Sequence, residues 1–309
     1  MLLMYLVTIV VSLIAVMALF PRQATMLAVA AERSRSGLRY KTVVIENETW
    51  HYLEGGPKDA EVVFLLHGFG GNKDNWTRFS KYLTGRYRVI APDLPGFGYS
   101  TQHPDWDYSL LPQRSRLHDF VQELGLQQFH IIGNSMGGYL AAIYSHEYSG
   151  QVRSLSLFNN AGINAPNESD MQRAVAKGEN PLIADSLSDY DELLDFVAYK
   201  KIFLPWPVRG VFAQGAVSQA ELHRSIFDSI QSGLSSGLES VLVDLKSPVL
   251  ILWGEYDRVL DVSSVEVMRE LLPQAEVVIM KDTGHLPMIE RPAETAAHFL
   301  RFVERHCRR

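Results

Sequence analysis

The sequence of 309 residues predicts an α/β fold with a mostly parallel central sheet, helices on both faces, a helical cap insertion and an N-terminal membrane helix. From residue 41 onward, short β-type runs alternate with helical stretches, which is typical of βαβ units. The alternation stops between residues 163 and 244, where no clear β run occurs. The net charge of -6 gives no support for a nucleic-acid partner.

The first twenty residues contain no charged side chain, and as a helix they would extend about 30 Å, the thickness of a bilayer core. We expect a transmembrane anchor over residues 1–21, followed by a basic juxtamembrane helix or linker over 22–40 that lies against anionic lipid. The alternative is a cleaved signal peptide, because Ala28-Val29-Ala30 resembles a cleavage site. The long apolar run, which no Lys or Arg precedes, favours the anchor. The positive-inside rule favours a cytoplasmic domain.

The core is expected to comprise residues 41–162 and 245–309. Its strands are predicted over residues 41–45, 49–54, 62–66, 88–91, 129–132, 152–158, 249–253 and 276–280. Its helices are predicted over residues 75–84, 111–124, 139–148, 263–272 and 293–305. The continuous apolar run at 62–66 is typical of a strand buried on both faces. The single cysteine, Cys307, cannot form an internal disulfide.

The strongest chemical signal is Gly133-Asn134-Ser135-Met136-Gly137, which follows an apolar β run and precedes a helix. This Gly-x-Ser-x-Gly pattern is typical of a sharp strand-to-helix turn that exposes a nucleophilic serine. The small residues two before and two after the serine avoid collision with the neighbouring helix and strand. The helix N-terminus favours developing negative charge. The alternative is a plain glycine-rich turn.

The loop His67-Gly68-Phe69-Gly70-Gly71 follows the strand at 62–66. A loop in this place lends a backbone N–H to an oxyanion hole, so we expect the two donors to be the N–H groups of Phe69 and Met136. His67 is interpreted as a structural residue whose ring holds the loop by hydrogen bonds.

A serine hydroxyl needs a base, and of the ten histidines only His285 lies in a post-strand loop near the C-terminus. Asp257, just past the strand at 249–253, is the candidate acid that fixes the tautomer of His285. The order serine, aspartate, histidine along the chain matches this assignment. The strand before the insertion ends in Asn159-Asn160, which offers no carboxylate. Rival acids are Glu255, Asp261 and Asp282.

Together these motifs resemble the α/β-hydrolase superfamily over residues 41 to 306. Within it the chain resembles membrane-anchored monoacylglycerol lipases and bacterial inner-membrane lipases and phospholipases A. The resemblance implies an α/β-hydrolase fold, an acyl-enzyme on Ser135, acyl glycerol or (lyso)phospholipid substrates, and no metal or organic cofactor. Bacterial relatives face the periplasm, which conflicts with the positive-inside rule. The motifs are His67–Gly71, Asp93–Ser100, Gly133–Gly138, Trp253–Leu260 and Gly284-His285.

The insertion at 163–244 is expected to form a cap over Ser135, with helices at 169–177, 189–200 and 218–231. Its apolar side chains would form an acyl-chain tunnel and a membrane-facing lid. The alternative is that they form the cap's own small core. The candidate substrate-binding residues are Phe203, Leu204, Trp206, Phe212 and Phe227.

Other functions remain open on the sequence alone. A C–C bond hydrolase or a cofactor-free haloperoxidase would keep the same serine triad. A receptor would use the pocket to bind a ligand without catalysis. The nucleophile must be a carboxylate in haloalkane dehalogenases and epoxide hydrolases, so Ser135 argues against both. Acyl-chain preference, head-group preference and oligomeric state are not predicted.

Overall fold

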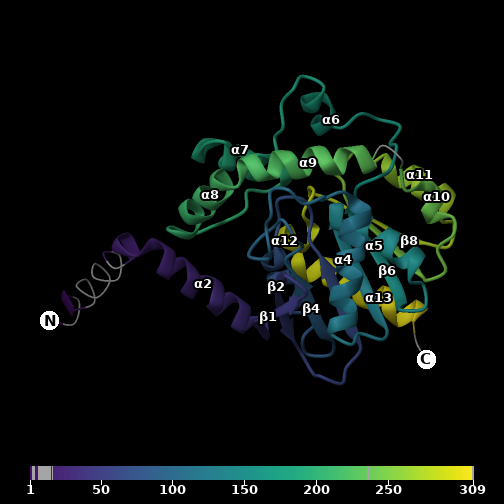
Figure 1. The fold of residues 1–309 in the computed structure, drawn as a ribbon, viewed down its shortest axis with the longest axis horizontal. Coiled ribbons are helices and arrows are strands. Elements are labelled where there is room, and N and C mark those ends of the chain that lie inside the picture. Colours follow the sequence, from purple (N-terminus) through teal and green to yellow (C-terminus); the bar gives the residue numbers. More distant parts are fainter. Residues whose placement is uncertain (2–3, 6–14, 16, 235–236, 308–309) are drawn as a thin grey trace.

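The computed structural model describes residues 1, 4–5, 15, 17–234 and 237–307, and within these it contains an eight-stranded sheet (Figure 1). The strand order is β1-β2-β4-β3-β5-β6-β7-β8. Only the β1–β2 and β2–β4 pairs are antiparallel, and all other neighbours are parallel. The predicted mostly parallel α/β sheet is therefore confirmed. The strands are β1 Leu38–Ile45, β2 Glu48–Gly55, β3 Val62–Leu66, β4 Arg88–Pro92, β5 Phe129–Ser135, β6 Val152–Asn160, β7 Val249–Gly254 and β8 Glu276–Met280.

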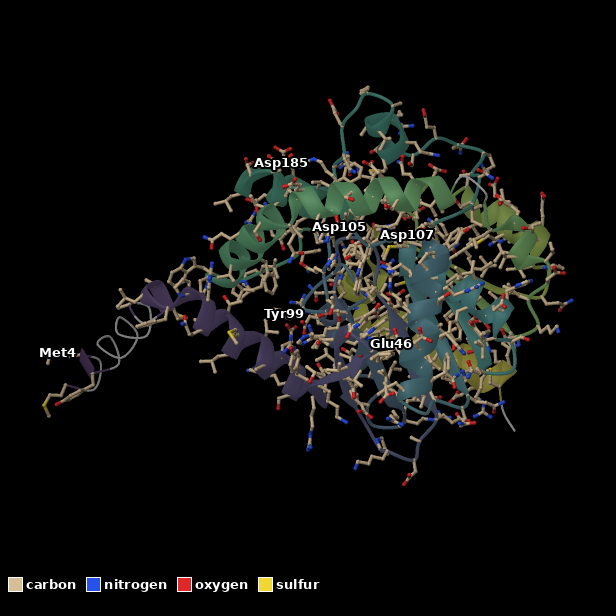
Figure 2. The ribbon with its side chains drawn as sticks, in the orientation of Figure 1. Met4, Glu46, Tyr99, Asp105, Asp107 and Asp185 are labelled. Atoms are coloured by element: carbon tan, nitrogen blue, oxygen red, sulfur yellow. The ribbon has the colours of Figure 1, made fainter. Side chains whose placement is uncertain are left out.

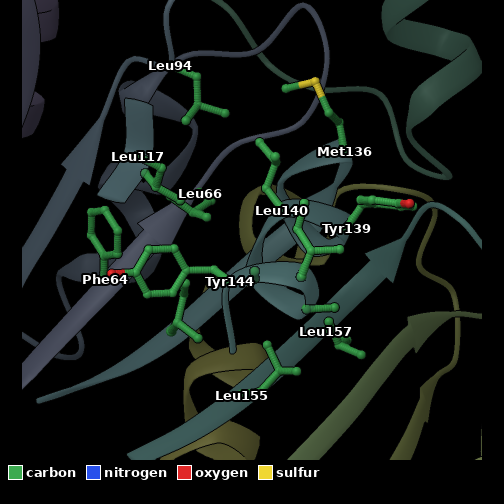
Figure 3. Packing of buried hydrophobic residues seen from close by; sticks show 14 of the residues in the cluster. Phe64, Leu66, Leu94, Leu117, Met136, Tyr139, Leu140, Tyr144, Leu155 and Leu157 are labelled. Carbon is green, nitrogen blue, oxygen red and sulfur yellow. The ribbon is translucent and has the colours of Figure 1, made fainter. Parts of the chain in front are cut away.

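Helices cover both faces of the sheet. One apolar cluster joins the sheet to α4, α5, α9, α10 and α11, and a second joins it to α3, α12 and α13. Figure 3 shows Leu140 and Tyr144 of α5 among Phe64, Leu66 and other side chains of the first cluster. The core helices are η1 Lys73–Trp76, α3 Thr77–Ser80, α4 Leu110–Glu123, α5 Met136–Glu147, α11 Ser264–Leu271, α12 Pro287–Glu290 and α13 Pro292–His306. The helix predicted over 75–84 is shorter, because helical structure ends at Ser80 and turns follow.

The described residues of the insertion form five helices, and Figure 1 shows α6, α7, α8 and α9 above the sheet and α10 beside α11. They are α6 Asp170–Val175, α7 Leu187–Val197, α8 Val208–Ser218, α9 Ala220–Leu234 and α10 Glu239–Leu242. The sequence did not predict α8, because Pro205, Pro207 and Gly210 resemble helix breakers. Pro207 stands at the N-cap of α8, where the missing N–H costs nothing.

The basic segment after residue 20 forms the helix α2 Pro21–Arg35, which extends away from the sheet in Figure 1. Its C-terminal end is held by ion pairs from Arg33 to Asp74 at 2.6 Å and from Arg78 to Glu32 at 2.8 Å. Among the described residues, none of the helices has the length and apolar character needed to cross a membrane. The predicted anchor at 1–21 falls largely on residues outside the described ranges.

Candidate active site

Ser135 lies at the junction of β5 and α5 with φ 57° and ψ -121°, a conformation that L-residues rarely adopt. The glycines on either side are required by close backbone contacts. A Cβ on Gly133 would lie 2.1 Å from the carbonyl oxygen of Gly137, and one on Gly137 would lie 2.4 Å from that of Leu66. The strained turn therefore exists only because both positions lack a side chain.

The imidazole of His285 and the carboxylate of Asp257 form a buried pair. Nδ1 of His285 lies 2.8 Å from Oδ2 of Asp257, so the Nδ1–H tautomer is favoured and Nε2 is left to accept a proton. The other carboxylate oxygen of Asp257 accepts the amides of Val259 at 2.8 Å and Leu260 at 3.0 Å. The rival Asp261 instead accepts the amide of Ser263 at 2.9 Å, within its own turn.

Two asparagines brace this pair, and sequence reasoning missed both. Nδ2 of Asn159, at the end of β6, donates to Oδ2 of Asp257 at 2.7 Å. Nδ2 of Asn134, beside the nucleophile, donates to the backbone carbonyl of His285 at 3.0 Å. Asn159 has a positive φ of 44°. The sequence feature that could have indicated a role for Asn159 is its position at the end of β6, the strand beside the one that bears Ser135.

The loop after β3 presses against the nucleophile turn. A Cβ on Gly68 would lie 2.9 Å from Cβ of Ser135, so the neighbouring Phe69 amide belongs to the immediate surroundings of the serine. Met136 is the first residue of α5, and such a residue has no intrahelical acceptor for its N–H. Both predicted oxyanion donors therefore lie in segments that meet at Ser135.

His67 is held on both ring nitrogens. Nδ1 lies 2.8 Å from the carbonyl oxygen of Gly68, and the amide of Leu94 donates to Nε2 at 2.9 Å. Burial lowers the pKa of this imidazole, which is consistent with a neutral ring. The structural interpretation of His67 as a loop-holding residue is confirmed.

The five apolar cap residues are placed differently from one another. Phe227 of α9 packs edge-on against Phe69 with ring centroids 5.4 Å apart. Phe203 and Trp206, in the segment between α7 and α8, are 75% and 57% exposed, and neither lines an enclosed tunnel in this structure. Leu204, which lies within this segment, and Phe212 of α8 are half-buried. Their role in substrate binding stays a prediction.

A further cap residue contacts the oxyanion loop. The ring of His223, one turn before Phe227 on α9, lies 5.6 Å from both Phe69 and Phe97. Burial lowers the pKa of His223 to about 4. Its Nε2 is buried without a hydrogen-bond partner in the described structure. An ion pair between Arg224 of α9 and Asp185, just before the start of α7, joins these two helices. Asp185 is labelled in Figure 2.

A cavity of about 290 Å³ lies beside Asp257, between the acid loop and the cap. Charged and phenolic side chains line it, including Asp195, Arg258 and Tyr256. This lining does not suit an acyl chain, because burying such groups against hydrocarbon would leave them unpaired. The cavity therefore offers no seat for a lipid tail, and the carboxylate of Asp257 has no exposed surface on it.

Comparison with known proteins agrees with this geometry. The family profile described as "alpha/beta hydrolase fold" matches residues 61–292. Lipase 1 of Psychrobacter immobilis is 37% identical over 273 residues, covering 88% of this chain and 86% of the lipase. Monoacylglycerol lipase ABHD6 of Bos taurus is 29% identical, covering 88% and 84% of the two chains. The crystal structure of a membrane phospholipase A, described as a bacterial virulence factor, superposes with a TM-score of 0.89 at 39% identity and covers 99% of each chain.

Proposed function

We propose that this chain, which belongs to the α/β-hydrolase family, hydrolyses acyl-lipid esters through an acyl-enzyme on Ser135, with His285 as base and Asp257 as the acid that orients it. The chain is a carboxylic-ester hydrolase of the lipase type, as its relatives are. The observation that carries the catalytic assignment is the buried pair of His285 and Asp257. The backbone carbonyl of this histidine accepts from Asn134, the residue before the serine on the strained turn. The proposal divides the chain into a core at 41–162 and 245–309 and a cap at 163–244. Residues 38–40, expected in the linker, belong to strand β1 and extend the core.

The reaction follows from the placement of these groups. Nε2 of His285 removes the proton from the hydroxyl of Ser135 while the oxygen attacks the ester carbonyl. The carbonyl oxygen becomes an oxyanion that accepts hydrogen bonds from the amides of Phe69 and Met136, each worth roughly 10²–10³ in rate. The imidazolium then protonates the leaving alcohol, and the acyl-enzyme forms. Water, deprotonated by the same imidazole, then attacks the acyl carbon. The bond to the serine oxygen breaks, the imidazolium returns the proton to Ser135, and the carboxylic acid leaves.

The proposed substrates are monoacylglycerols, lysophospholipids and phospholipids. The relatives named as monoacylglycerol lipase and membrane phospholipase A support this range. Phe227 on the Phe69 ring supplies apolar surface beside the oxyanion loop. We assign the rest of the acyl-binding surface to the cap residues Phe203, Leu204, Trp206 and Phe212.

We further propose that residues 1–21 anchor the enzyme in a bacterial inner membrane with its catalytic domain in the periplasm. The charge-free run at 1–20 supports an anchor, and the relative described as a membrane phospholipase supports membrane association. Met26 and Leu27, each about two-thirds or more exposed on α2, offer apolar surface to lipid. Protease treatment of spheroplasts would digest the domain if it is periplasmic and spare it if it is cytoplasmic.

The function is tested with a substrate panel on the detergent-solubilised full chain. The panel contains p-nitrophenyl esters of rising chain length, a monoacylglycerol, a lysophospholipid, a diacyl phospholipid and a vinylogous diketone. We expect turnover of the esters and of at least one lipid class, and its loss in Ser135→Ala. Turnover of short soluble esters alone would contradict the lipid assignment, and turnover of the diketone alone would favour the C–C bond hydrolase.

A further inference from the structure

The cap and the base meet at the end of α7. The backbone amide of His285 donates to the carbonyl oxygen of Val197, the last residue of α7, at 2.9 Å. A Cβ on the preceding Gly284 would lie 2.6 Å from the amide nitrogen of Tyr199. The histidine loop therefore has backbone contact with the cap, with no room for a side chain between them.

Glu290, the last residue of α12, bridges the same two segments with its carboxylate. Oε1 accepts the amides on either side of the base, from Gly284 at 3.0 Å and from Leu286 at 3.3 Å. Oε2 accepts cap amides, from Tyr199 at 2.8 Å and from Lys200 at 3.4 Å. One oxygen thus holds the base loop and the other holds the cap.

Keeping the carboxylate of Glu290 ionised in this position costs free energy, because the group is partly removed from water. Burial raises the pKa of Glu290, although the four backbone hydrogen bonds act in the opposite direction. Hydrogen bonds from backbone amides to a carboxylate are stronger than those to a neutral acceptor. A half-buried carboxylate that accepts hydrogen bonds from both segments is therefore suited to hold the base loop and the cap in one fixed position.

The cap also contacts the loop that carries Asp257. Tyr199 stacks on Tyr256, the residue before Asp257, with ring centroids 4.4 Å apart. The amide of Met171 donates to the carbonyl oxygen of Arg258 at 3.0 Å. Displacement of the cap near Tyr199 would therefore disturb both partners of the acid–base pair.

We propose that Glu290 is a positioning residue that couples the cap to the catalytic base, so that His285 is correctly placed only while the end of α7 is docked. This inference rests on the function proposed above. If α7 lifts, the bonds from Tyr199 and Lys200 to Oε2 and the bond from His285 to Val197 break together. The loop that carries the imidazole is then no longer held in place, and the enzyme is inactive while the cap is open.

The first test compares Glu290→Gln with Glu294→Gln, using soluble p-nitrophenyl acetate and a fluorophosphonate to count working sites. Glutamine keeps one acceptor oxygen and loses the other, whereas Glu294 lies on the surface and pairs only with Arg291 in the described structure. We expect kcat per titrated site to fall about 10–100-fold in Glu290→Gln, because a small misplacement of a catalytic group has that effect. KM should stay within about threefold, and Glu294→Gln should match wild type.

The second test measures amide hydrogen exchange and does not depend on activity. In Glu290→Gln, exchange should accelerate together in the peptides that contain residues 197–200 and 284–286, and Glu294→Gln should leave both unchanged. The proposal is overturned if kcat per site is unchanged, or if only one of the two segments exchanges faster. A wild-type enzyme that takes no fluorophosphonate would instead contradict the proposed function.

Discussion

The strand-end loops of the core and the cap above them are built in different ways. Around Asp257 each carboxylate oxygen has two donors, and His285, Asp257 and Asn159 are all nearly or fully buried. In the cap, among the residues that the structure describes, a separate apolar cluster has three buried members, namely Met171, Val197 and Val259, the last of these from the core. The exposed Phe203 and Trp206 belong to the same insertion.

This difference assigns the two regions different tasks. A saturated hydrogen-bond network holds catalytic groups in one geometry, which is what proton transfer and nucleophilic attack require. Ile226 and Ile230 of α9 belong to the main core cluster, whereas the segment between α7 and α8 exposes Phe203 and Trp206. Such an exposed apolar segment can move and can meet lipid at low cost. We therefore expect the core to hold the reacting groups, and the cap to control access and, through Glu290, the placement of His285.

The largest expected effect comes from the core acid. Asp257→Asn should lower kcat roughly 10⁴-fold, because the amide no longer fixes the tautomer of His285 or stabilises its charged form. The matched control is Asp261→Asn, which removes a carboxylate four residues away and should stay within a few-fold of wild type. Rates on p-nitrophenyl acetate decide this, and comparable losses in the two variants would contradict the assignment of the acid.

Two glycine-to-alanine substitutions, one in the core and one in the cap, should change the free energy of unfolding in opposite directions. Gly137→Ala puts a Cβ 2.4 Å from a backbone oxygen of β3, so we expect a loss of about 4 kcal/mol or more in unfolding free energy. Gly210 lies within α8 with no heavy atom within 4 Å of the added Cβ. Gly210→Ala should stabilise the cap helix by about 0.5–1 kcal/mol. Urea unfolding measures both, and a tolerated Gly137→Ala would show that the turn is not tight.

Acid should weaken the packing of the cap through His223. Its folded-state pKa of about 4 lies below the ordinary value of 6.5, so its neutral form is favoured on folding. The contribution of neutral His223 to the free energy of unfolding is fully present above pH 6.5 and is lost as the pH falls from 6.5 toward 4. Between pH 7 and pH 5 wild type should lose about 2 kcal/mol more than His223→Leu.

His130 in the core, whose pKa burial also lowers to about 4, is present in both proteins and cancels in that comparison. Urea titrations of the two proteins at both pH values give the measurement. If wild type and His223→Leu lose the same free energy of unfolding between pH 7 and pH 5, protonation of His223 does not destabilise the fold.

The smallest effect is expected at the exposed tip of the cap. The double variant Phe203→Ala with Trp206→Ala should weaken binding to phosphatidylcholine vesicles roughly tenfold, because both side chains would otherwise leave water. Turnover of soluble p-nitrophenyl acetate should be unchanged. Lost turnover of the soluble ester would place these side chains in the catalytic core, and unchanged vesicle binding would remove them from the lipid surface.

The sequence predicted the core well because its signals are local. Continuous apolar runs predicted β3 and β8 at their observed bounds, and the small residues around Ser135 are imposed by the turn itself. The pairing of His285 with Asp257 could be expected because both follow neighbouring parallel strands, whose carboxyl ends lie at one edge of a sheet.

The remaining features depend on contacts between distant segments. Tyr199 and Glu290 are 91 residues apart, and no local pattern indicates that they meet. Asn159 was noted only as a strand end without a carboxylate, yet its amide holds the acid. The helix α8 was missed because its flanking prolines resemble breakers although one of them stands at the helix start.

The central claim, that Ser135 is the nucleophile, is tested most directly by mapping the site of a fluorophosphonate adduct by peptide mass spectrometry. We predict one phosphonyl group per chain on the peptide that contains Ser135, and none in Ser135→Ala. A label on another residue, or a label that persists in Ser135→Ala, would contradict the account.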